Sequence, residues 1–157
     1  MTDTRDPAEQ PAGDPAEQPA GDPAEAPIFR GFSEFGELLA DFIATTPSIR
    51  GAILTDDKGD PIDFTHRHAL LSALDAQIAG AQVEQTTLRI QAWCARHGLG
   101  SCEILVEASH GMLLSGAPQQ DCVLSCLHTR HEGDDDDPEL LLTRFAALRR
   151  QIAELLR

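Results

Sequence analysis

Basic residues are scarce in this sequence, and long apolar runs are absent. Lysine and arginine together number 12 against 26 aspartates and glutamates, which gives a formal net charge of −14. This balance argues against a nucleic-acid partner, because neutralising a phosphate backbone requires a cationic face, and it also disfavours anionic membrane surfaces. No apolar run approaches the ~20 residues of a membrane-spanning helix, and no basic start followed by an apolar stretch indicates a signal peptide. The expected location is therefore the cytoplasm, with no membrane partner.

The signatures of common catalytic sites are also missing. A phosphate-binding loop needs glycines followed by Lys-Ser or Lys-Thr, but the one lysine, Lys58, stands among aspartates. Ser109 and His110 are adjacent, so on a strand their side chains would point in opposite directions and could not act as nucleophile and base. Glu103 and Glu107 would lie roughly 13 Å apart on a strand, too far for paired-carboxylate chemistry. We therefore expect no enzymatic activity, no catalytic residue and no cofactor.

Four cysteines raise the question of a metal site or a disulfide: Cys94, Cys102, Cys122 and Cys126. In a chain that is not exported, buried reduced thiols are the usual state. Cys122 and Cys126 fall within an apolar run typical of a strand, which would place them roughly 13 Å apart and prevent them from sharing an ion. A helix at this position would bring the two thiols together, so the expectation of no metal site depends on the strand.

The first 28 residues do not resemble a folded segment. Asp6 to Gly13 reads DPAEQPAG, and the same eight residues recur from Asp14 to Gly21 and begin again at Asp22. Nothing in this repeat is large and apolar, so burial cannot offset the entropy lost on ordering. We predict a disordered acidic tail over residues 1–28 and one folded domain over residues 29–157. The tail is interpreted as a solubilising spacer, with a docking segment for a basic partner as the alternative.

The remaining sequence predicts helices and strands in a definite order. Ser33 suits the cap of a helix that ends near Thr46, before a proline. The following hairpin, Arg50 to Phe64, has Gly59 at the turn position where a positive φ is needed. Later come a long helix over about 69–97, three strands within 102–127 and a last helix capped by Asp137, with proline at its first position. A calcium loop over 134–137 is the alternative for that acidic run, but the aspartates lack the necessary alternation.

The long helix carries apolar residues on two sides. A helix that lies on one sheet needs one apolar stripe, so the second side suggests a neighbouring subunit or another protein. The alternative is that the second side holds scattered surface apolar residues. We assign one side to the sheet: Leu70, Leu74, Ala81, Leu88 and Ala92, flanked by Leu71 and Ile78. We assign the other to an interface: Val83, Ile90 and Cys94, with Ala76 and Thr87.

The order helix, hairpin, long helix, three-strand meander and helix resembles the Roadblock/dynein light-chain family. The resemblance is carried by Phe35 to Phe42 and by the segment Ile49 to Ile62, in which a small residue, an apolar run, aspartates, a turn glycine and a proline follow one another. The start of the long helix and the strands within 103–114 also fit. The long helix and the acidic loop before the last helix are longer than the family pattern.

This resemblance implies an α+β fold, a five-stranded antiparallel sheet flanked by helices in the order α-β-β-α-β-β-β-α. It also implies a homodimer that regulates or scaffolds a Ras-like small GTPase, as members including a bacterial gliding-motility protein do. The predicted partner or dimer interface comprises Val83, Thr87, Ile90, Cys94, Glu103 and Leu105. A bound GTPase would admit Arg89 or Arg96 as an arginine finger. The rival interpretation is a small PAS-type sensory domain, which the low aromatic content of 4% and the unbroken long helix disfavour.

Overall fold

A computed structural model of the chain describes residues 26–68, 70–129 and 137–157. Residues 1–25 of the tail predicted over 1–28, and most of the acidic run before the last helix, lie outside these residues. The predicted end of the tail is wrong by one residue, because Ile28 belongs to the first strand. The described elements follow in the order β1 (Ile28–Phe29), α1 (Glu34–Thr45), β2 (Ile49–Asp56), β3 (Pro61–Arg67), α2 (Ala73–Arg96), β4 (Glu103–Ala108), β5 (Gly111–Gln119), β6 (Cys122–Thr129) and α3 (Pro138–Leu155).

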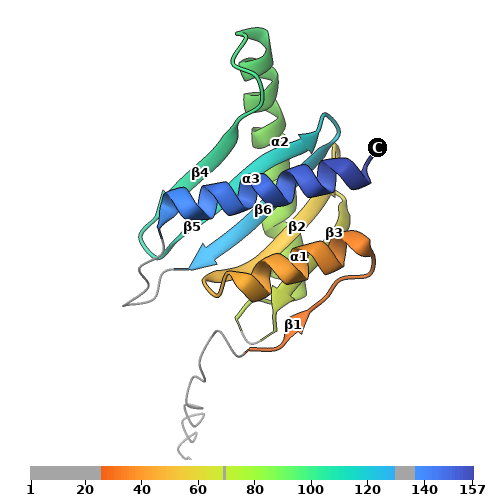
Figure 1. Ribbon diagram of the computed structural model, residues 1–157, viewed down its shortest axis with the longest axis vertical. Helices are drawn as coiled ribbons and strands as arrows, with labels where there is room; N and C mark the ends of the chain where they lie inside the picture. The colour runs from red at the N-terminus through yellow and green to blue at the C-terminus, as the bar shows by residue number, and fades with distance from the viewer. Residues whose placement is uncertain (1–25, 69, 130–136) are drawn as a thin grey trace, which may run out of the picture.

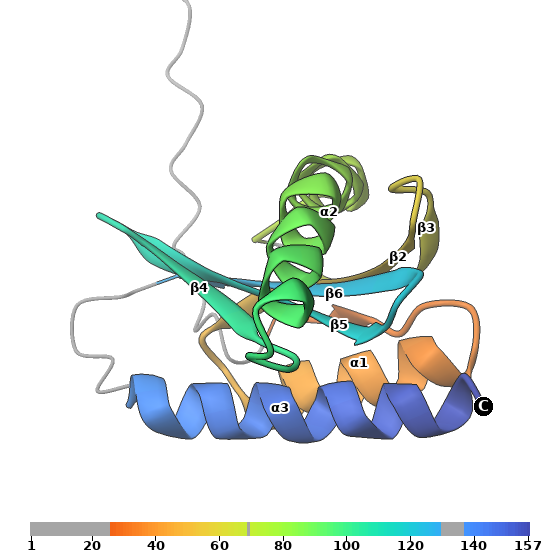
Figure 2. The same cartoon turned by 90° about the horizontal axis from the view of Figure 1, so that it is seen from above.

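The described strands form one antiparallel sheet in the order β1-β3-β2-β6-β5-β4. In Figure 1 and Figure 2, α1 and α3 cover one face of this sheet, and α2 crosses the other. The α+β class and the order of the three helices are therefore confirmed. The prediction of five strands is wrong, because the described sheet has a sixth strand, β1. This strand is only two residues long and shows no alternation of apolar and polar residues, so the sequence pattern did not indicate it. It forms by pairing Ile28 with Arg67 and Phe29 with His66 of β3.

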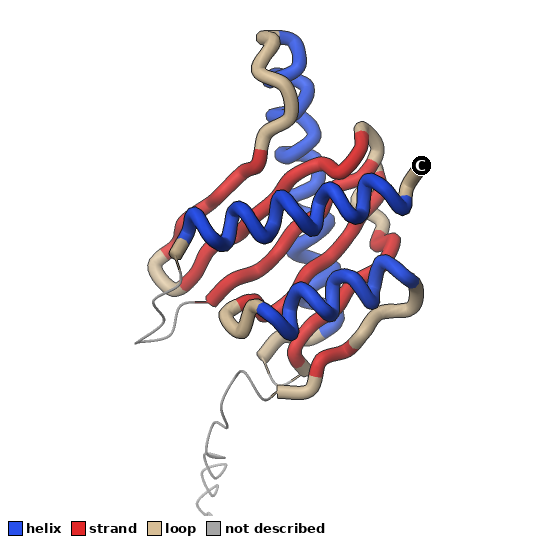
Figure 3. The backbone as a smooth tube through the Cα atoms, in the orientation of Figure 1, coloured by secondary structure: helices blue, strands red, loops and turns tan. Residues whose placement is uncertain are grey.

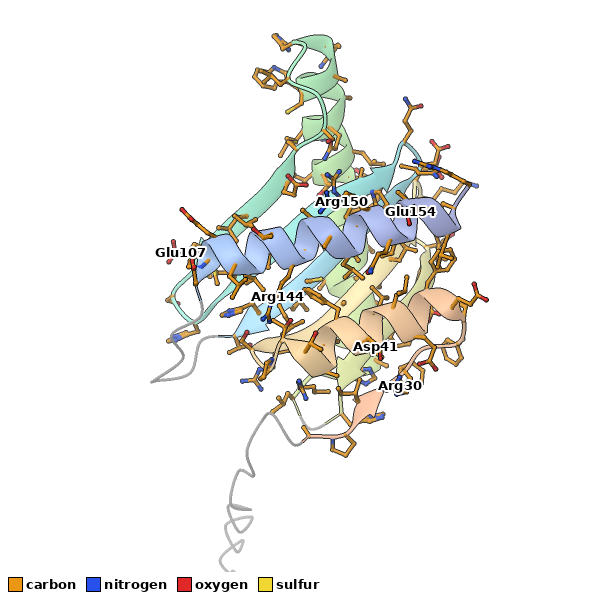
Figure 4. The ribbon with its side chains drawn as sticks, in the orientation of Figure 1. Arg30, Asp41, Glu107, Arg144, Arg150 and Glu154 are labelled. Atoms are coloured by element: carbon orange, nitrogen blue, oxygen red, sulfur yellow. The ribbon has the colours of Figure 1, made fainter. Side chains whose placement is uncertain are left out.

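The main core lies between the sheet and the helix pair α1 and α3. Leu39 and Ile43 of α1 and Phe145 and Ile152 of α3 are fully buried there against apolar side chains of β2, β5 and β6. Arg144 extends from α3 toward α1 (Figure 4), where its guanidinium donates to the Thr45 carbonyl at 2.9 Å. This bond satisfies a carbonyl near the end of α1 that has no partner within the helix.

The predicted caps and turns are confirmed. Ser33 accepts a hydrogen bond from the Phe35 amide at 3.2 Å, and Asp137 accepts one from the Glu139 amide at 2.9 Å, each at a helix N-terminus. Gly59 has a φ of +84°, a conformation that few other residues adopt without strain. Pro61, which has no amide hydrogen to donate, begins β3 at a part of that strand that β1 does not reach.

The long helix begins later than predicted. Leu70 and Leu71 precede it in a turn, and the Ser72 side chain accepts from the Asp75 amide at 3.1 Å to cap the first residues of α2. The helix then runs unbroken for 24 residues, and its C-terminal end projects past the strands (Figure 3). None of the helices in the described ranges is long and apolar enough to cross a membrane.

Candidate interaction surface

The side of α2 that contacts the sheet is lined with small and polar residues. Ala76, Gly80 and Thr87 are buried there, and the Thr87 hydroxyl lies 2.8 Å from the hydroxyl of Ser115 on β5. At Gly80, an added Cβ would stand 2.8 Å from two methyl groups of Ile53 on β2. Small residues are required on this side because the helix approaches the sheet so closely.

The predicted assignment of the two helix sides is therefore wrong in part. Thr87 and Cys94, which we placed in an interface with a partner, are 0% and 6% exposed and belong to the contact between α2 and the sheet. In contrast, part of the side assigned to the sheet faces solvent, although Leu71 and Leu88 are half-buried. Leu74 and Ile78 are 64% and 50% exposed. We call this side the outward stripe of α2, defined as Leu74, Ile78, Ala81, Gln85 and Ala92.

A second apolar surface lies where α2 leaves the sheet uncovered. Of the described helices, only α2 lies on this face, and the end of the sheet where β4 turns into β5 extends well beyond it (Figure 2). Val106 on β4 pairs with Leu113 on β5, which pairs with Leu127 on β6, so these three side chains share the α2 face of the sheet.

Val83 and Ile90 of α2 border the same region, as the contacts of the other flank of the helix indicate. On that other flank, Ala81 lies against the β2–β3 turn, and Leu88 faces the β5–β6 turn across a cavity of about 660 Å³. Val83 and Ile90, about half a turn around, are half-buried and point toward the opposite end of the sheet. We call the resulting surface the α2–β4 patch, which comprises Val83, Ile90, Ile104, Val106, Leu113 and Leu127.

Strand β4 forms the edge of the sheet beside this patch. Its six residues pair with β5 on one side, and on the other they pair with no strand in the described part of the chain. Glu103 and Leu105 point to the opposite face, where the Glu103 carboxylate pairs with Arg149 of α3 at 2.6 Å. The six predicted interface residues thus do not share one surface. Val83 and Ile90 border the patch, Thr87 and Cys94 are buried, and Glu103 and Leu105 lie on the α3 side of the edge.

Comparison with known proteins identifies the architecture. No family model matches the sequence, and no curated protein matches it. Among solved structures, a Roadblock/LC7 domain from Streptomyces avermitilis superposes with a TM-score of 0.63 at 18% identity, covering 76% of this chain and 95% of that domain. MglB from Myxococcus xanthus gives 0.64 at 10% identity, covering 80% and 96%. A structure of MglB in a tetrameric arrangement gives 0.63 at 15% identity, covering 85% and 90%. The chain has the Roadblock/LC7 fold.

The Roadblock/LC7 fold confirms the resemblance drawn from the order of elements. Sequence reasoning found Val83 and Ile90 but did not include Val106, Leu113 or Leu127 in the surface. One signal was available: Ile104 and Val106 share one face of β4, and the other face carries Glu103 and Glu107 around Leu105, which is typical of a strand with one more apolar face. What the sequence could not show is that α2 leaves this apolar face uncovered.

One side chain on the sheet-facing side of α2, that of Glu84, is buried with an incomplete set of hydrogen bonds among the described residues. Glu84 is 1% exposed, and its Oε2 atom has no hydrogen-bond partner among the described residues. Burial raises the pKa of Glu84 above the ordinary value of a glutamic acid, and the nearby Asp57 and Asp56 carboxylates raise it further, while Arg89 opposes them. The folded state therefore favours the protonated acid more than the unfolded state does.

We expect Glu84→Gln to stabilise the protein near neutral pH. Because the folded-state pKa is raised, the stability that depends on protonated Glu84 is complete below the unfolded pKa and is lost as pH rises through the folded one. Glutamine carries no charge, so the variant avoids the cost of burying an ionised carboxylate. This is expected to add about 1 kcal/mol to the free energy of unfolding at pH 7, and the gain should shrink toward acid pH, where Glu84 is protonated in both states. Urea denaturation between pH 4 and pH 8 measures both effects. A variant less stable than the parent at pH 7 would contradict a penalised carboxylate.

Proposed function

We propose that this chain is a non-catalytic interaction module that associates with a second copy of itself and regulates or scaffolds a Ras-like small GTPase. The observation that carries the proposal is the α2–β4 patch beside β4, an edge that no second strand of the described residues covers, in a chain with the Roadblock/LC7 fold. One solved structure with this fold is of MglB in a tetrameric arrangement, which supports self-association as a property that the fold permits.

The surface suits a second copy related by a two-fold axis. Two β4 edges from identical chains pair antiparallel when the axis passes between them, which extends the sheet across both copies. The α2–β4 patch lies next to that edge, so the same operation brings the two patches together. An exposed apolar edge strand without lysine or proline is an aggregation hazard unless something covers it. Pairing of the two copies removes that hazard.

The outward stripe of α2 is then left for the GTPase. It faces away from the sheet, and Trp93, which is 49% exposed and stacks on His97, lies beside it. Arg89 and Arg96 are exposed on the same helix. Exposed aromatic and arginine side chains are the types that contribute most to protein–protein affinity. The PAS-type alternative is disfavoured, because such domains usually carry several short helices where this chain has one continuous helix, α2.

Two substitutions at equally exposed positions test the assignment. Val106 in the α2–β4 patch and Ile78 in the outward stripe are each 50% exposed, so an aspartate at either site is tolerated by the fold. We expect Val106→Asp to weaken self-association at least about tenfold, because it buries an unpaired charge in the interface. We expect Ile78→Asp to leave self-association intact. Sedimentation velocity across a concentration series measures both.

The GTPase half of the proposal uses the same two variants. Purified Ras-like GTPases of the same genome, loaded with GDP or with a slowly hydrolysed GTP analogue, are titrated against each variant by calorimetry. Ile78→Asp is expected to lose binding that the parent shows. An Ile78→Asp variant that binds as the parent does would rule out the outward stripe, and a Val106→Asp variant that self-associates normally would rule out the α2–β4 patch.

A further inference from the structure

Two thiols face each other at the junction of α2 and β4. The sulfur atoms of Cys94 and Cys102 are 3.4 Å apart, and both residues are reduced. Cys94 lies on the last turns of α2 and is 6% exposed, while Cys102 immediately precedes β4 and is half-buried. A disulfide has a sulfur–sulfur distance of about 2.05 Å, so the pair needs to close by only about 1.3 Å.

The segment between the two cysteines has room for this movement. Gly98 and Gly100 have φ angles of +71° and +73°, and a Cβ at either would meet no described atom within 4 Å. The Gln91 side chain binds both the amide and the carbonyl of Cys102, which holds that residue against α2 as a paired strand would. The thiols therefore stay close together while the connecting loop adjusts.

The other two cysteines are placed differently. Cys122 and Cys126 lie on β6 and belong to the core under α1 and α3. Their side chains point to the face of the sheet opposite α2, because Cys126 pairs with Leu114 in that core. Neither faces the α2–β4 junction, so oxidation without unfolding is confined to one pair.

We propose that Cys94 and Cys102 form a reversible disulfide by exchange with a low-molecular-weight disulfide such as oxidised glutathione, and that this bond strengthens self-association through the α2–β4 patch. The second half rests on the proposed function. The bond ties the start of β4 to α2, and these two elements contribute four of the six residues of the patch as well as its edge strand. Fixing them in one arrangement lowers the entropy lost on association.

The exchange has two steps. The thiolate of Cys102, the more exposed residue, attacks one sulfur of the glutathione disulfide, and one glutathione thiolate leaves. The thiolate of Cys94 then attacks the Cys102 sulfur of the mixed disulfide, and the second glutathione leaves. The protein loses two hydrogens, and one glutathione disulfide becomes two thiols. Burial, together with the Cys94 thiol, raises the pKa of Cys102 to about 11. The first step is therefore slow at neutral pH, and its rate should rise about tenfold per pH unit up to pH 9.

The first measurement is the bond itself. The full chain is equilibrated in mixtures of reduced and oxidised glutathione, quenched with acid, alkylated and digested, and the peptides are identified by mass spectrometry. We expect a cross-linked peptide pair containing Cys94 and Cys102, with Cys122 and Cys126 unmodified until the protein is unfolded. The matched control, Cys94→Ser, should stop at a Cys102–glutathione mixed disulfide. A parent protein that also stops there, or that links Cys102 between two chains, would overturn the proposal.

The second measurement separates this inference from the proposed function. The dissociation constant of the self-associated form is determined for reduced and oxidised protein by sedimentation, with Cys94→Ser in both buffers as the control. We expect oxidation to lower the constant at least about threefold in the parent and to leave the control unchanged. Equal constants for a protein shown to carry the bond would overturn its regulatory role. If Val106→Asp also leaves self-association unchanged, the proposed function of the α2–β4 patch is wrong. The disulfide between Cys94 and Cys102 is tested separately, by the cross-linked peptides of the first measurement.

Discussion

Replacing Asp63 with alanine is expected to lower the free energy of unfolding by about 3 to 4 kcal/mol. Asp63 lies on β3 and is 1% exposed, and its carboxylate lies at the N-terminus of α1. It accepts hydrogen bonds from the amides of Phe32, Ser33 and Gly36 at 2.9 to 3.1 Å, from the Ser33 hydroxyl at 2.5 Å and from its neighbour Phe64 at 2.8 Å. Alanine would leave the buried amides of Gly36 and Phe64 and the part-buried donors of Phe32 and Ser33 without this acceptor, and it would remove a negative charge from the positive end of the helix.

Two controls separate this carboxylate from acidic residues in general. Asp41 is an exposed acid on α1 that lies 3.5 Å from Arg30 (Figure 4), and Asp41→Ala should cost less than about 0.5 kcal/mol. Ser33→Ala removes the helix cap but keeps the carboxylate, and should cost about 1 kcal/mol. Guanidinium denaturation monitored by circular dichroism measures all three. A loss below about 1 kcal/mol for Asp63→Ala would mean that water replaces the carboxylate.

The elements that could be predicted from the sequence are those specified by local chemistry. Ser33, Asp137 and Gly59 each satisfy a requirement of the backbone within a few residues, so their roles do not depend on distant parts of the chain. Strand β1 is different. Its two residues carry no periodic pattern, and it exists because it pairs with His66 and Arg67, which lie far along the chain. A prediction based on alternation has no means of finding such a strand.

The orientation of α2 could not be predicted because both of its sides are moderately apolar. Choosing the side with the larger leucines assumes that the core takes the largest side chains. Here the helix lies so close to the sheet that small residues are selected instead, and Thr87 is buried because Ser115 provides a hydrogen-bond partner on β5. The same close contact explains why Leu74 and Ile78 are exposed. The two-sided pattern correctly indicated a second apolar side, but Leu74 and Ile78, which turn away from the sheet, belong to the side predicted to face it.

The position of α2 also determines the candidate interaction surface. The width of sheet left uncovered, and hence the size of the α2–β4 patch, depends on where the helix axis lies. The contact between Gly80 and Ile53 sets this position near the middle of the helix, and the Gln91 bonds to Cys102 set it near the end. A change at Gly80 should therefore affect both stability and self-association, although Gly80 itself lies outside the patch.

Gly80→Val is expected to lower the free energy of unfolding by about 3 kcal/mol, because the new side chain would overlap its neighbours on β2. A Cβ at this position would stand 2.8 Å from two Ile53 methyl groups and 3.2 Å from a Thr55 methyl group. The helix must then move away from the sheet, so self-association should weaken as well. Ile53→Ala alone should cost about 2 to 4 kcal/mol through the cavity that it leaves.

Combining the two changes tests the mechanism. If valine at position 80 is harmful because it meets Ile53, the double variant Gly80→Val with Ile53→Ala should be more stable than the sum of the single effects predicts, by at least about 1 kcal/mol, since the new side chain fills the space left by the old one. Denaturant titration of the four proteins gives this coupling directly. Strictly additive losses would mean that the helix position is set elsewhere, and that the small residues on this side of α2 do not determine how much of the sheet remains open to a partner.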